Sequence, residues 1–112
     1  MKWKWFFIHF LFVGNLLFAS DEVQERVLRR IHCCFLVEDF YSAEKFSKKA
    51  LQEYPDSEEL HMAYIRSLSS NGREKLALDA LRDFIARFGA GQHNFIEEVA
   101  WGVLHKIGRA HV

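Results

Sequence analysis

The stretch DFYSAEKFSKKALQEYP, residues 39–55, keeps its small and apolar positions when the chain is read again 34 residues later, over residues 73–89. The residues that precede each stretch show the same period. The matched pairs are Ala43 and Ala77, Phe46 and Ala80, Ala50 and Phe84, Leu51 and Ile85, Tyr54 and Phe88, Ile31 and Ile65, and Cys34 and Leu68. A fixed period of this length is typical of helix–turn–helix units that stack into an extended array. The repeat therefore predicts an all-α protein.

Apolar residues at spacings of three and four predict helices throughout residues 21–106. Pro55 ends the helix formed by the quoted stretch, because proline inside a helix removes a backbone hydrogen bond. Asp56 or Ser57 is expected to cap the next helix, which ends at the Ser70-Asn71-Gly72 sequence. A fourth helix is expected over residues 73–88 and a fifth from about Asn94. The apolar stripe expected for the fifth helix comprises Phe95, Ile96, Val99, Trp101 and Leu104.

The segment from Asp39 to Phe46, followed by Lys49-Ala50-Leu51 and Tyr54-Pro55-Asp56, resembles the second half of a tetratricopeptide repeat. In that family a small residue in the second helix, helix B, lets the first helix, helix A, approach closely, and a proline closes the unit. The resemblance covers about Gln24 to Phe88. The departures from the family pattern are Arg30, Ile31, Ser47, Tyr64, Ile65 and Gly89, the last in the place where Pro55 would recur.

The resemblance implies a right-handed α-solenoid of two helical hairpins plus one extra helix, in units of about 24–57, 58–91 and a partial unit 92–106. The segment Glu97–Leu104 fits less well and is compatible with a third repeat or with the start of HEAT-type repeats. The residues expected to pack the units together are Ala43, Phe46, Ala50, Pro55, Gly72, Ala77, Leu81 and Phe84. The unpaired last helix is expected to self-associate through Phe95, Val99 and Trp101.

In arrays of this family the A helices line the concave face, so the resemblance also implies a binding surface. The residues of the A helices expected to point away from helix B are Glu25, Leu28, His32, Phe35, Glu59, Met62, Arg66 and Ser69. Such a mixture of apolar and charged side chains suits a groove for a peptide or a helix of another protein. We therefore expect a protein–protein interaction scaffold without catalysis.

Two alternative functions stay open from the sequence. In the first, the repeats are the docking arm of a longer enzyme or assembly factor whose remaining part follows Lys106. In the second, the chain is a membrane-anchored scaffold that keeps its N-terminal helix.

The N-terminus has the pattern of a secretory signal peptide. Lys2 and Lys4 precede an almost wholly apolar run over residues 6–19, which is shorter than the roughly 20 residues that a membrane-spanning helix needs. Ala19 and Ser20 then form the expected cleavage site. We therefore expect residues 1–19 to be a signal peptide, the mature chain to reach the periplasm or cell envelope of a bacterium, and any membrane contact to be limited to this segment.

The six residues Ile107–Val112 match the translation of a widely used sequencing adapter, ATC GGA AGA GCA CAC GTC, which is followed by a stop codon. We expect residues 107–112 to be a non-native tail and the chain to be a fragment of a longer protein.

Composition argues against several other functions. The formal net charge is zero, which gives no reason to expect nucleic acid. Cys34 lies on the apolar stripe and is expected to pack in the core, whereas Cys33 is expected to be more exposed. The histidines outside the two ends form no i, i+4 ligand pair, and no catalytic motif is present. No metal and no cofactor is therefore expected.

Overall fold

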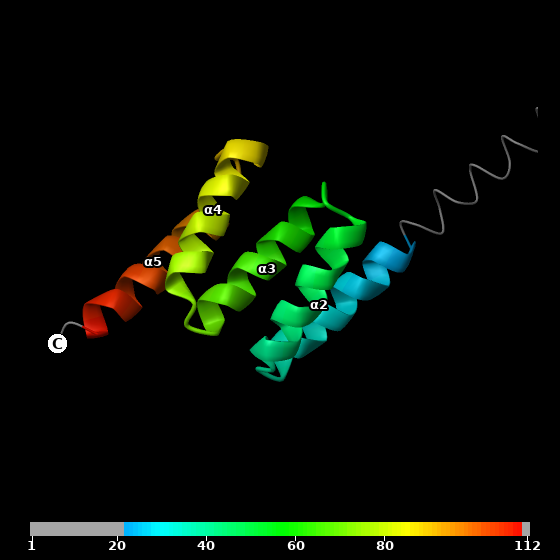
Figure 1. The fold of residues 1–112 in the computed structure, drawn as a ribbon, viewed down its shortest axis with the longest axis horizontal. Helices are drawn as coiled ribbons and strands as arrows, with labels where there is room; N and C mark the ends of the chain where they lie inside the picture. Colours follow the sequence, from blue (N-terminus) through cyan, green and yellow to red (C-terminus); the bar gives the residue numbers. More distant parts are fainter. Residues whose placement is uncertain (1–21, 111–112) are drawn as a thin grey trace, which may run out of the picture.

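The computed structural model describes the backbone of residues 22–110 and the side chains of residues 22–105, and the expected signal peptide lies outside these residues. The described part is helical and contains no strand. Its five helices are a first helix over residues 22–36, α2 (Phe40–Glu53), α3 (Glu58–Ser70), α4 (Glu74–Phe88) and α5 (His93–Ala110). The predicted all-α class is confirmed. Each helix from α2 onward packs against the next one, so that the helices form a row (Figure 1).

Side-chain caps fix where two of the helices begin. Asp39 accepts a hydrogen bond from the Ser42 backbone N–H at 3.2 Å and starts α2. Ser57 accepts one from the Leu60 N–H at 3.4 Å and starts α3. In both cases a side-chain oxygen satisfies a donor that the helix itself leaves unpaired.

The first helix and α3 end in the same way, at positions 34 residues apart. Gly72 has a φ of 76°, and the Arg73 N–H donates to the Leu68 carbonyl at 3.0 Å. The Asp39 N–H likewise donates to the Cys34 carbonyl, at 2.8 Å. The residue equivalent to Gly72 is Glu38, with a φ of 59°. Both turns are Schellman motifs, but only the second has the glycine that such a backbone favours.

The core consists of two apolar clusters that share α3. The cluster nearer the N-terminus contains Ile31, Ala43, Ala50, Leu60 and Ala63. The second cluster contains Ile65, Leu68, Ala77, Leu81, Phe84, Phe95, Val99 and Val103. One end of α3 therefore packs in the first hairpin and its other end packs against α4 and α5.

Most of the residues expected to pack the units together are buried. Those with little or no exposed surface are Ala43, Ala50, Ala77, Leu81 and Phe84. Phe46 is half-buried, while Pro55 and Gly72 are exposed at turns. Ser47, one of the departures from the pattern of the resembled family, is fully buried, and its hydroxyl donates to the Ala43 carbonyl at 2.7 Å. The small hydroxyl is thus satisfied within its own helix.

The expected stripe of α5 needs correction. Val103 is fully buried, whereas Trp101 is 70% exposed and Leu104 is 59% exposed. Phe95, Val99 and Val103 follow one another at intervals of four and so lie on one face of the helix, against α3 and α4. Trp101 lies two residues from Val99 and therefore points elsewhere. Phe95 and Val99, two of the three residues expected to mediate self-association, are thus buried within the chain, while the third, Trp101, is exposed. Within residues 22–110, no helix combines the length and the apolar character needed to cross a membrane.

Candidate functional site

The A helices, namely the first helix, α3 and α5, contact one another along one face of the row. The Gln24 side chain donates to the Ser57 hydroxyl at 2.8 Å and joins the first helix to the start of α3. The Arg66 guanidinium lies 3.3 Å from the Glu98 carboxylate and joins α3 to α5. These long-range contacts place the side chains of successive A helices next to each other.

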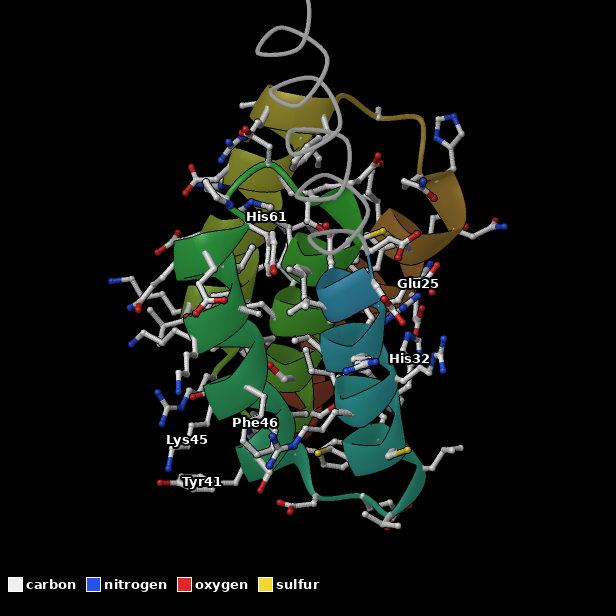
Figure 2. The ribbon with its side chains drawn as sticks, turned by 90° about the vertical axis from the view of Figure 1, so that its right-hand side faces the viewer. Glu25, His32, Tyr41, Lys45, Phe46 and His61 are labelled. Carbon is white, nitrogen blue, oxygen red and sulfur yellow. The ribbon has the colours of Figure 1, made fainter. Side chains whose placement is uncertain are left out.

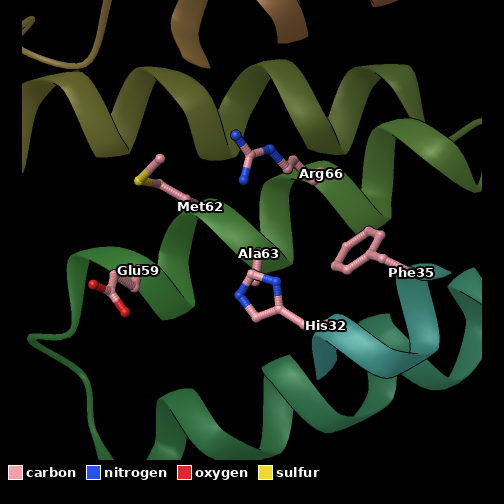
Figure 3. Close-up of a pocket in the computed structure, with 6 residues that line it drawn as sticks. All are labelled: His32, Phe35, Glu59, Met62, Ala63 and Arg66. Atoms are coloured by element: carbon pink, nitrogen blue, oxygen red, sulfur yellow. The ribbon is translucent and has the colours of Figure 1, made fainter. Parts of the chain in front are cut away.

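An open pocket of about 490 Å³ lies between the first helix and α3 (Figure 3). Its lining residues are His32, Phe35, Glu59, Met62, Ala63 and Arg66. All of these except Ala63 belong to the set that the sequence indicates for the A-helix face. The structure therefore brings together five of the eight candidate residues from two separate helices.

The pocket combines an apolar floor with polar side chains at its edges. Phe35 packs against the first core cluster and Met62 against the second, and both are half-buried, while Ala63 is a buried member of the first cluster. His32 and Glu59 are exposed and, among the described residues, form no ion pair or hydrogen bond. In Figure 3 the His32 ring projects toward Ala63 across the gap between the two helices. These two polar groups are available to a ligand.

Arg66 differs from His32 and Glu59 because its side chain is held in place. Besides its ion pair with Glu98, its guanidinium lies 5.0 Å from the centroid of the Phe95 ring. A cation over an aromatic face is attracted by the ring quadrupole. The positive end of the pocket is thus oriented by two residues of α5.

The remaining three candidates lie outside the pocket. Glu25 is exposed and pairs with Arg29 at 3.4 Å on the same helix. Leu28 packs against the first core cluster. Ser69 lies beside α5, since a Cβ atom on Gly102 would be 3.6 Å from its hydroxyl. The candidate surface is therefore centred between the first helix and α3.

Sequence reasoning missed Ala63, which lines the pocket floor. Its spacing from Glu59 and Arg66, by four and three residues, is the signal that could have indicated it, because residues at these spacings lie on one face of a helix. The thiols lie as expected, with Cys33 exposed and Cys34 half-buried against the first cluster. The described residues contain no group of three potential metal ligands.

No protein-family model matches the sequence, and no curated protein or solved structure matches the chain. The observations that bear on its class are therefore the 34-residue period, the helical hairpins and the packing of neighbouring helices.

Proposed function

We propose that this protein is a tetratricopeptide-like, right-handed repeat scaffold that binds a peptide or a helix of another protein along its A-helix face, without catalysis. The observation that supports this proposal is the pocket between the first helix and α3. Five residues chosen from the repeat pattern converge there from two helices.

The lining indicates what a ligand would have to offer. A pocket of about 490 Å³ lies within the range of roughly 300–1,000 Å³ that is usual for binding sites. Phe35 and Met62 would bury an apolar side chain, which contributes about 1.5–3 kcal/mol. Glu59 would pair with a cationic group of the same ligand. A short segment with a large apolar residue next to a lysine or arginine therefore suits the pocket best.

The test is a selection of binders from a random peptide library on the immobilised chain, followed by affinity measurements on the selected peptides. Replacing His32 and Glu59 by alanine should weaken binding about tenfold or more, because the peptide loses its polar partners. The matched control replaces Lys75 and Asp79, exposed residues of α4. If both double variants bind equally well, the peptides bind elsewhere and the proposal fails.

We also propose export to the envelope of a bacterium, supported by the signal-peptide pattern of residues 1–19. An exported scaffold would meet its partner outside the cytoplasm.

A further inference from the structure

A second surface of the first hairpin is rich in unpaired cations. Among the described residues, no ion pair uses Arg30, Lys45, Lys48 or Lys49. All four side chains are exposed. Most other basic groups of the described chain are neutralised by a carboxylate, as Arg73 is by Glu44 at 3.4 Å. Because no ion pair neutralises these four cations, this face is locally positive although the whole chain has a formal net charge of zero.

Three of these cations, Arg30, Lys45 and Lys49, line a pocket of about 420 Å³ between the first helix and α2. Its lining residues are Val27, Arg30, Lys45, Phe46, Lys49, Ala50 and Glu53. The Arg30 guanidinium lies over the Phe46 ring, 4.2 Å from its centroid, and this contact orients the guanidinium. Only one carboxylate, that of Glu53, lines the pocket. An anionic group would therefore meet several cations there.

Exposed apolar side chains lie at the adjoining end of the hairpin. Val37 is 74% exposed and Tyr41 is 71% exposed. Leu36, which is also exposed, follows His32 by one helical turn and so lies on the other side of the first helix. Tyr41 precedes Lys45 by one helical turn and so lies on the same side of α2. Figure 2 shows Tyr41, Lys45 and Phe46 on one side of the first hairpin, with Glu25 and His32 on the other. This face is thus separate from the pocket on the A-helix face.

We propose that this face, comprising Arg30, Lys45, Lys48, Lys49 and Tyr41 with Val37 at the adjoining turn, binds the surface of a bilayer that contains anionic phospholipids. Lipid phosphates would neutralise the cations, each of which strengthens such binding several-fold. Val37 would enter the boundary between head groups and acyl chains, and tyrosine is favoured at that depth. An acidic protein would satisfy the cations equally well but would leave Val37 and Tyr41 exposed, so the bilayer is the better match.

The experiment is flotation of the full chain with vesicles of phosphatidylglycerol and phosphatidylcholine, compared with vesicles of phosphatidylcholine alone. The neutral vesicles report binding through apolar parts of the chain. Because Lys2 and Lys4 also favour anionic vesicles, only the part of the excess binding that substitutions in the patch remove is assigned to the patch. Lys45→Gln with Lys49→Gln should lower the partition coefficient for anionic vesicles about 30-fold. The matched control, Lys75→Gln with Arg82→Gln, also removes two exposed cations that form no ion pair and should change it little.

A second pair of substitutions separates a bilayer from a soluble polyanion. Val37→Ser with Tyr41→Ser should weaken vesicle binding about fivefold or more, and should leave binding to soluble polyglutamate unchanged. Equal losses in the two cation variants would overturn the proposal, because they would show attraction to charge in general. The proposal would also be overturned, in favour of an acidic protein partner, if the serine substitutions left vesicle binding unchanged and the chain bound polyglutamate as tightly as it binds the vesicles.

Discussion

Glu38 is the one non-glycine residue with a positive φ among the described residues, and replacing it by glycine should stabilise the protein. Its φ of 59° costs an L-residue about 1–2 kcal/mol relative to glycine. Glycine loses about 0.5–1 kcal/mol more backbone entropy on folding than alanine does. The Glu38 side chain is exposed and forms no hydrogen bond or ion pair in the described part of the chain, so nothing else is lost. We therefore expect Glu38→Gly to raise the free energy of unfolding by about 0.5–1 kcal/mol.

The assay is urea unfolding followed by far-UV circular dichroism, supported by a thermal scan in which the midpoint should rise by roughly 2–8 °C. The equivalent turn of the second repeat provides an internal control, in which the reverse substitution is expected to lower the free energy of unfolding. Gly72 has a φ of 76°, and an added Cβ would meet only a Glu74 carboxylate oxygen at 3.9 Å. Gly72→Ala should therefore destabilise through backbone strain alone. If Glu38→Gly is no more stable than the unmodified chain while Gly72→Ala is less stable, the positive φ of Glu38 does not cost the stability inferred for it.

Three further predictions concern other parts of the chain. Gly102→Ala should stabilise α5 by about 0.5–1 kcal/mol in urea unfolding, because alanine favours the helix more than glycine does. The added Cβ would fit, at an ordinary 3.6 Å from the Ser69 hydroxyl. A loss of stability would mean that α5 packs more tightly on α3 than this distance indicates. Hydrogen bonds from the Ser42 hydroxyl and backbone N–H lower the pKa of Asp39 in the folded chain. The stability that the ionised Asp39 contributes is therefore present above the unfolded pKa of about 3.9 and is lost as the pH falls through the lowered pKa. The urea midpoint of the unmodified chain should therefore fall relative to that of Asp39→Asn below about pH 4, and parallel pH profiles would contradict this. Expression of the full chain in a bacterium should yield a mature protein that begins at Ser20, as read by N-terminal sequencing, whereas retention of Met1 would contradict cleavage.

The helices and their ends could be predicted from sequence because their causes are local. Ser57 caps α3 as expected, and the observed α4 begins one residue after the expected start at Arg73. Capping oxygens, proline and the positive φ of glycine act within a few residues, so the sequence alone indicates them. The burial of Ala43 and Ala77 followed from the 34-residue period in the same way.

The face of α5 could not be predicted in full, because its apolar residues surround much of the helix. Trp101 and Val103 are both apolar, and only packing against α3 and α4 decides that Val103 is buried while Trp101 is exposed. Local propensity does not distinguish the two positions.

The sequence by itself determined that this chain is a series of helices with a 34-residue period, and it indicated most of the side chains on the A-helix face. Only the tertiary structure decided which of them meet. His32 and Met62 are 30 residues apart in the chain, and they line one pocket because the first helix and α3 both pack around Ile31 and Leu60. The contact of Arg30 with Phe46 arises in the same way. Periodicity fixes which side of a helix is apolar, but the approach of two helices depends on side chains distant in sequence, and it is this approach that forms both surfaces.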